Sequence, residues 1–509
     1  MRLAPVLLLT AAALAGCTVG PDFHRPAPPA TAAYQPADEA RAALPGQPAA
    51  AVGEGPAGRW WQAFGSPELD ALVDRALAHN QGLEASDATL AAARDELRAV
   101  VGKQLPQFDA NASIHQEQVN LAGFGFAPSP ALGLNGNPAF SLYSVGGGIS
   151  YDLDLFGGLR RQVEQTAARA EAQQRQTEAA HLALAGQVVN QVLVIGAIRS
   201  RIATTETILA EDQRNLDLTR KRQQGGEGTL VEVLNAESQL TADRGPRPQL
   251  DQQLAEARHL LATLVGVVPA DLGPTDFDLD RLTLPANVPV ALPSALVRQR
   301  PDILQAEADL HAATAAVGVA TAHLYPDVAL GASDTQGSPD VGTLLNNAFR
   351  GYDLFAGVST PIFHGGTLKA QRAAAMERAH AADATYRNTV LGAFAQVANL
   401  LSALQTDARS LAVQREAVDV AGRSVKLSRR SFEVGNSGLL QVLDSERLYQ
   451  RASADFVDAR ARQYLNVARL YVATAGGWTQ QKSSPSQMGR GTAGTAVEGS
   501  RALARDGRD

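Results

Sequence analysis

The 509-residue chain contains one cysteine, and only 5% of its residues are aromatic. A single cysteine cannot form an internal disulfide, and so few aromatic side chains argue against a large globular core. After residue 16 we find no uninterrupted run of about 18 apolar residues, so the sequence predicts no transmembrane helix there and any membrane span must use strands. The net charge of −7 offers no basic surface for nucleic acid.

Patterns that support enzyme chemistry are also missing. The nine histidines are dispersed, without a His-Glu-x-x-His pattern or a Cys/His cluster that would bind a metal. No serine stands in a Gly-x-Ser-x-Gly turn, and the glycine runs lack the lysine of a phosphate-binding loop. The sequence therefore predicts no enzyme, no metal and no bound cofactor.

The chain instead contains a duplication. A shift of 209 residues carries one row of apolar residues, spaced seven apart, onto a second such row, and carries Val233–Glu237 onto Val442–Glu446. The first row is Val188, Ile195, Ile202, Leu209 and Leu216; the second is Val397, Leu404, Leu411, Val418 and Val425, extended by Val390 and Phe432. Such a period predicts long helices in left-handed supercoils. No proline interrupts Leu159 to Gln224 or Thr367 to Val434, which allows helices on the order of 100 Å long. A soluble coiled-coil rod remains an alternative at this point.

Other segments alternate with a period of two. In residues 106–156 and again in 326–363, apolar side chains share one face of each predicted strand, and small or polar side chains share the other. This is the pattern of a transmembrane β-barrel, although an ordinary half-exposed sheet also shows it. Two hairpins give four strands, whereas the smallest closed barrels need about eight. Strands in lipid tolerate no open edge, so several chains must share one barrel if the strands span a membrane.

The N-terminus supplies a route to the membrane. Residues 1–16 have the charged start and apolar run of a secretory signal peptide, which is too short for a permanent span. They end in the lipobox Leu14-Ala15-Gly16-Cys17, so we expect acylation of Cys17 to tether the mature chain.

Three motifs carry a family resemblance: Cys17–Phe23 followed by Arg25-Pro26, the block around Arg300-Pro301-Asp302, and the paired segments Gly226–Glu237 and Gly435–Glu446. With them the chain resembles the TolC-like outer-membrane efflux proteins, in their lipoprotein (OprM/NodT-type) branch. The resemblance implies a mixed α and β membrane protein: a homotrimer with a long α-helical coiled-coil tunnel and a transmembrane β-barrel of twelve strands, four from each chain.

The resemblance also implies a function and its residues. The implied protein is an outer-membrane lipoprotein, anchored and spanning, that acts as the exit duct of a tripartite system with a periplasmic adaptor and an inner-membrane pump, expected to be of the RND type. Its cargo would be drugs or other small toxic compounds; a type I protein secretion duct and a non-conducting trimeric scaffold are alternatives. The implied periplasmic aperture comprises Asp444, Phe432, Gln441 and Glu232, and the tip hairpins include Gly226, Leu230, Gly435 and Leu439.

These expectations divide the chain into six parts. They are a signal peptide (1–16), an extended linker (17–58), a first repeat (59–268), a connector (269–291), a second repeat (292–478) and a disordered tail (479–509).

Overall fold

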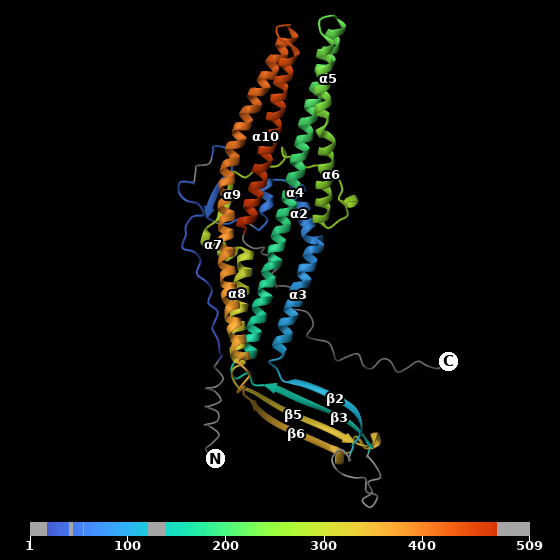
Figure 1. Ribbon diagram of the computed structural model, residues 1–509, viewed down its shortest axis with the longest axis vertical. Coiled ribbons are helices and arrows are strands. Elements are labelled where there is room, and N and C mark those ends of the chain that lie inside the picture. Colours follow the sequence, from blue (N-terminus) through green and yellow to red (C-terminus); the bar gives the residue numbers. More distant parts are fainter. Residues whose placement is uncertain (1–17, 40–43, 54, 57, 121–138, 476–509) are drawn as a thin grey trace, which may run out of the picture.

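The computed structural model describes residues 18–475 apart from 40–43, 54, 57 and 121–138. The predicted signal peptide, Cys17, most of the first strand-connecting loop and the predicted tail therefore lie outside the described residues. The chain is elongated, with two helical hairpins at one end and a sheet at the other (Figure 1). Its N-terminal segment runs alongside α9, where Tyr34 packs edge-on against Phe394.

Two helices of equal length dominate the structure. α4 (Gly158–Gln224) and α9 (Thr367–Glu433) each contain 67 residues, and both pairs of ends are related by the 209-residue shift. The same shift relates the starts of the returning helices, α5 (Leu230–Arg244) and α10 (Leu439–Thr474). Most of both heptad rows is buried, as the seven-residue period predicts.

The return path differs between the halves. α10 is continuous, but in the first half α5 stops at Arg244 and α6 (Pro246–Val265) begins with a proline. Proline lacks a backbone N–H and clashes with the preceding helical turn, so it fits the first turn of a new helix and not the interior of an old one.

Shorter elements complete the two halves. The helices are α2 (Pro67–His79), α3 (Gln81–Gly102), α7 (Pro293–Gln299) and α8 (Pro301–Ala322), with 3₁₀ turns at Trp60–Phe64, Pro269–Asp271, Val341–Thr343 and Asn347–Phe349. Strands β1 (Ala49–Gly53) and β4 (Asn287–Ala291) pair in parallel and join the N-terminal linker to the connector.

The second sheet is antiparallel and has the order β2-β3-β5-β6. Its strands are β2 (Gln107–Gln118), β3 (Ala139–Asp152), β5 (Asp327–Ser338) and β6 (Arg350–Ser359). One cross-strand row is apolar: Phe108, Ile149, Ala332 and Leu354. The adjacent row points to the opposite face and is small or acidic: Asp109, Gly148, Ser333 and Asp353. Within the described residues, β2 and β6 are each paired on one side only.

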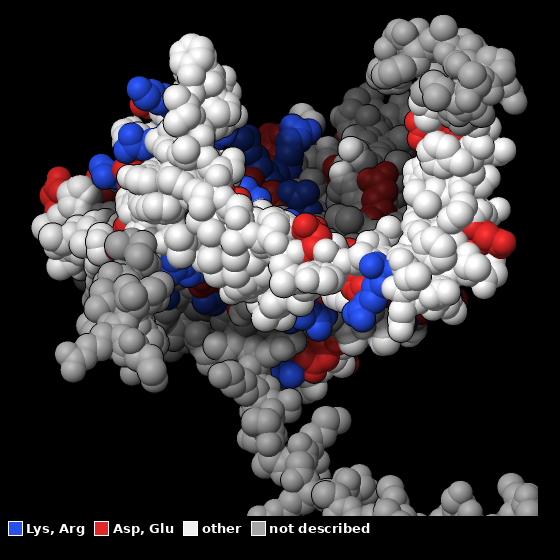
Figure 2. All heavy atoms as spheres, turned by 90° about the horizontal axis from the view of Figure 1, so that it is seen from below, with Lys and Arg blue, Asp and Glu red and all other residues white. Residues whose placement is uncertain are grey.

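Viewed along the long axis from the strand end, the chain curves around a hollow (Figure 2). Charged atoms lie deep inside this hollow, whereas the nearer surface is mainly uncharged. One chain thus forms a curved wall on one side of this hollow.

The hydrophobic core lies at mid-height, where the linker and the connector surround the helices. Trp60, Trp61 and Phe64 are fully or almost fully buried there, and Trp60 stacks on Tyr471 with ring centroids 5.5 Å apart. The two tryptophans therefore pack in the core.

The same core explains the longest apolar stretch of the helices. Among the described helices, α4 alone contains an 18-residue stretch of length and hydropathy compatible with a membrane span, with a mean hydropathy of 1.6. Of this stretch, 56% is buried inside the chain, and Val188, Val192 and Ile195 belong to the mid-height core. Its apolar character is therefore explained by packing.

We predict that Trp61→Ala lowers the free energy of unfolding by about 3–5 kcal/mol, because it empties a fully buried site at the centre of the core. Thermal unfolding followed by circular dichroism would measure the change. The exposed Leu260→Ala provides a matched loss of an apolar side chain, and equal effects of both substitutions would contradict the assignment of this core.

Candidate functional site at the helical tips

The first tip, between α4 and α5, is held by a capping box. Gly226 adopts a φ of +80°, which favours glycine and turns the chain after α4. Thr229 Oγ1 accepts a hydrogen bond from the Glu232 amide (3.3 Å), and the Thr229 amide donates to Glu232 Oε2 (2.8 Å). The Glu232 carboxylate, which we expected at the aperture, is therefore engaged within its own hairpin. The spacing Thr-x-x-Glu is the sequence signal that could have predicted this cap.

The second tip, between α9 and α10, lacks the equivalent cap. Gly435 has a φ of +77° and turns the chain as Gly226 does. At the duplicated positions, however, Gly438 replaces Thr229 and Gln441 replaces Glu232, and the N-cap of α10 has no side-chain hydrogen bond. A glycine N-cap costs a helix only a few tenths of a kcal/mol relative to threonine, so the second tip is held slightly less firmly by local interactions.

A small apolar cluster joins the two tips. It contains Leu216, Val233, Ala236, Leu240, Phe432, Leu439, Val442 and Leu443. The Arg222 guanidinium lies 4.3 Å from the centre of the Phe432 ring, and Arg222 Nη1 donates to the Phe432 carbonyl (3.3 Å). Phe432 is thus buried among the tip helices of one chain. Its predicted place at the aperture of a trimer stays a prediction.

Other expected aperture residues lie at the surface of the second hairpin. Asp444 and Gln441 are exposed one helical turn apart on α10, and Arg447 Nη1 lies 3.7 Å from Asp444 Oδ1. Leu230 is exposed at the first tip, whereas its duplicate Leu439 is buried in the cluster. The two tips therefore present different surfaces despite their common origin.

A buried polar network below this cluster joins all four tip helices, and no periodic pattern in the sequence predicted it. Arg429 on α9 donates from Nε to Glu446 Oε1 on α10 (2.9 Å) and also pairs with Glu211 on α4. Asn215 on α4 donates to the same Glu446 oxygen (2.5 Å). Glu446 is 3% exposed, so the network fixes a charge inside the bundle.

A second carboxyl in this network has a raised pKa. Asp212 on α4 is 3% exposed, and burial is the main cause that raises its pKa to about 8. A hydrogen bond with Asp243 on α5 and the negative charges of Asp243 and Glu446 raise this pKa further, against the opposing effect of Arg429. A protonated Asp212 can donate a hydrogen bond to Asp243, which an ionised one cannot.

The Arg300-Pro301-Asp302 motif lies far from the tips, at the start of α8. Arg300 donates to Asp302 Oδ1 (2.8 Å), to the Ala473 carbonyl (3.2 Å) and to Gln396 Oε1 (2.6 Å). Arg300 therefore connects the α7–α8 turn to α9 and to the end of α10, so its role is structural.

The arrangement of sheet, long helices and paired tips can be compared with known proteins. A family model described as "Outer membrane efflux protein" matches residues 72–267 and 292–476. The chain belongs to the outer membrane efflux protein family.

Individual relatives agree with this assignment. The pyoverdine export outer membrane protein OpmQ of Pseudomonas aeruginosa is 31% identical, over 83% of this chain and 88% of the relative. The toluene efflux pump outer membrane protein TtgC of Pseudomonas putida is 29% identical, over 95% of this chain and 97% of the relative. The outer-membrane channel OprN superposes with a TM-score of 0.80 at 28% identity, covering 91% of this chain and all of OprN. The open state of the MtrE channel of Neisseria gonorrhoeae gives 0.76 at 26% identity, covering 91% and 99%.

The predicted fold class is confirmed by these findings. The chain has the fold of the trimeric TolC-like channels: its four strands are one third of a twelve-stranded barrel in the outer membrane, and its helices are one third of a tunnel that extends into the periplasm. Phe108, Ile149 and Leu354 of the apolar row are exposed in one chain, and the tips form the periplasmic end.

We predict that Asp212→Asn stabilises the tips at high pH and reduces the pH dependence of unfolding. Between the ordinary pKa of 3.8 and the folded-state value of about 8, the folded protein holds a proton that the unfolded chain releases. The stability that this proton provides is therefore present in acid and is lost as the pH rises through about 8. Thermal midpoints between about pH 5 and pH 9 would measure the effect. Asp217→Asn, at an exposed position of the same helix, should leave the wild-type profile unchanged.

Proposed function

We propose that three copies of this chain form the exit duct of a tripartite efflux assembly, in which a periplasmic adaptor connects the duct to an inner-membrane pump of the RND type. One observation carries this proposal. A sheet with two half-paired edge strands and an apolar face continues directly into two 67-residue helices within the same chain. A soluble rod or a non-conducting scaffold has no use for such a sheet, whereas a duct needs both parts.

In this proposal the duct conducts passively and catalyses no reaction. The inner-membrane pump supplies the energy, and the chain supplies a path across the outer membrane. Relatives named for the export of pyoverdine and toluene support small compounds over proteins as cargo.

The adaptor is proposed to bind at the tips. The first tip exposes Leu230, Val231 and Leu234, three apolar side chains close to the end of the molecule. Exposed apolar side chains grouped in this way are typical of protein interaction sites. Contact there would act on the hairpin that shares the apolar cluster with the second tip.

Opening is proposed to move the second hairpin. Its N-cap lacks a side-chain hydrogen bond, so the second tip has a weaker local restraint than the first. Three exposed Asp444 carboxylates around the threefold axis would repel one another and attract cations. Phe432 would act indirectly in this gate, by holding the second tip against the first.

Planar-bilayer recording tests the duct function. We expect conductance steps from purified protein and a higher open probability for Phe432→Ala, because loss of the buried ring loosens the two tips. An increase of about tenfold in the ratio of open to closed channels requires only about 1.4 kcal/mol, shared among three subunits. Phe432→Leu retains an apolar side chain and should behave almost like the wild type. Absence of any steps would favour the scaffold.

Replacing Cys17 with serine tests the proposed lipid. We expect the variant to lose metabolic labelling with a fatty acid and to be recovered in smaller amounts from outer-membrane fractions, because a covalent acyl chain needs the thiol. A Thr18→Ala variant is the control, since it keeps the cysteine. Equal labelling of the serine variant and the wild type would exclude Cys17 as the acylation site.

A further inference from the structure

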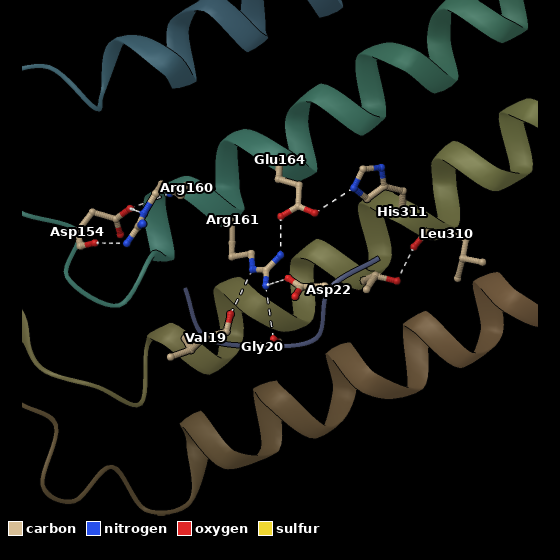
Figure 3. Close-up of polar contacts among 10 residues, drawn as sticks. Val19, Gly20, Asp22, Asp154, Arg160, Arg161, Glu164, Leu310 and His311 are labelled. Atoms are coloured by element: carbon tan, nitrogen blue, oxygen red, sulfur yellow. Dashed lines mark hydrogen bonds and ion pairs between the residues drawn. The ribbon is translucent and has the colours of Figure 1, made fainter. Parts of the chain in front are cut away.

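The first described residues of the chain lie across the joint between the helices and the sheet. Residues 18–25 contact the beginning of α4 and run along α8 from Gly318 to Glu307. The close-up shows Val19, Gly20 and Asp22 around Arg161 of α4 (Figure 3). The Val19 amide donates to the Phe156 carbonyl (3.2 Å), which lies in the turn between β3 and α4. The segment is therefore attached where strand β3 enters the helical tunnel.

Arg161 on α4 forms most of the polar contacts of this segment. It donates from Nε to the Val19 carbonyl (3.2 Å) and from Nη2 to the Gly20 carbonyl (3.4 Å) and Asp22 Oδ1 (2.6 Å). Its Nη1 donates to Glu164 Oε2 (2.7 Å) on the same helix (Figure 3). Arg161 is 4% exposed, and a buried guanidinium without such partners would be strongly destabilising.

Three glycines allow the segment to lie this close to the helices. A Cβ on Gly20, whose φ is +97°, would lie 2.4 Å from the Gly318 Cα of α8. A Cβ on Gly318 would lie 2.7 Å from Arg161 Cγ, and one on Gly157 would lie 2.8 Å from Thr18 Cγ2. Glycine is unfavourable inside a helix, so the close approach explains why Gly318 stands within α8.

Further contacts attach the segment to α8. The ring of Phe23 stacks on His311 with centroids 4.4 Å apart, and His311 Nε2 lies 2.9 Å from Glu164 Oε1 on α4. Arg25 pairs with the buried carboxylate of Glu307. Because α4 belongs to the first repeat and α8 to the second, the segment bridges both halves at the joint.

We propose that residues 18–25 form a strap that fastens the anchored N-terminus to the α4–α8 seam and stabilises the joint between tunnel and barrel, with Arg161 as the positioning residue. The anchoring part of this proposal rests on the proposed acylation of Cys17. Consecutive Cα atoms are about 3.8 Å apart, so an acyl group on Cys17 would start one residue from the joint. The anchor and the sheet would then be held at the same level of the membrane.

Hydrogen exchange of the full-length protein in micelles tests the strap. For Arg161→Ala we expect exchange in peptides covering residues 18–25 to become about tenfold faster, because several charge-assisted hydrogen bonds are lost. Peptides covering residues 153–160 should also exchange faster, and detergent-resistant trimers should dissociate at a lower temperature. Gly318→Ala should act in the same direction by pushing the segment away, and Arg161→Lys should restore part of the protection.

Controls separate the strap from general damage to α4. Arg169→Ala removes the same charge from an exposed position of the same helix and should leave exchange in both segments unchanged. If Arg161→Ala fails to fold, Asp22→Ala loosens the strap without altering either helix. Equal exchange of residues 18–25 in Arg161→Ala and Arg169→Ala would overturn the proposal. Release of the segment without any change in residues 153–160 would overturn it equally.

The serine variant at Cys17 distinguishes the two proposals. Loss of the acyl group with residues 18–25 still protected would support a strap that is built independently of the lipid. Retained acylation would reject the lipid site and leave the strap measurable by the same peptides. Loss of protection in the serine variant to the level of Arg161→Ala would contradict a strap held by Arg161.

Discussion

Backbone hydrogen bonding in hydrocarbon is the constraint on which this structure depends. A sheet that meets lipid cannot leave the N–H and C=O groups of its edge strands unpaired, and the four-stranded sheet of one chain has two such edges, β2 and β6. Pairing the edges with further copies closes a barrel. This closure fixes how the helices that follow the strands are arranged. The helices that continue from the strands become the wall of one tunnel, and the tips are brought around a common axis. Assembly is therefore a condition for the membrane-spanning state and not an addition to it.

The duplicated halves have long helices of equal length, but their tips differ in local stability. α4 and α9 have equal length, as a tunnel wall built from both halves requires. The tips have diverged at the positions that control local stability: Thr229 and Glu232 form a capping box, and Gly438 and Gln441 do not. The proline break after Arg244 also interrupts only the first return path. An asymmetric pair of hairpins can hold one tip steady while the other moves.

Buried charges connect the parts of the chain at both ends of the tunnel. At the tips Arg429 and Glu446 join helices of both halves, and near the sheet Arg161 joins the N-terminal segment to the seam. Such groups contribute little net stability compared with apolar packing of the same volume, because they lose hydration on burial. Buried charged groups do destabilise incorrect packing of the helices, because displacement of one partner leaves the other charge buried and unpaired. Both networks therefore favour specificity of assembly at places where separate elements must meet.

The sequence alone determined the elements and the class of protein. Periods of seven and two, the absence of proline and the 209-residue shift predicted long duplicated helices and four strands with one apolar face. These predictions succeeded because each depends on interactions along one element. Only the tertiary structure decided what lies opposite each side chain. It buried Phe432 under Arg222, engaged Glu232 in a cap, placed Asp212 beside Asp243 and covered the apolar stretch of α4 with core residues. The partners in most of these contacts come from other helices, and a periodic pattern states which face of an element is covered but not by what.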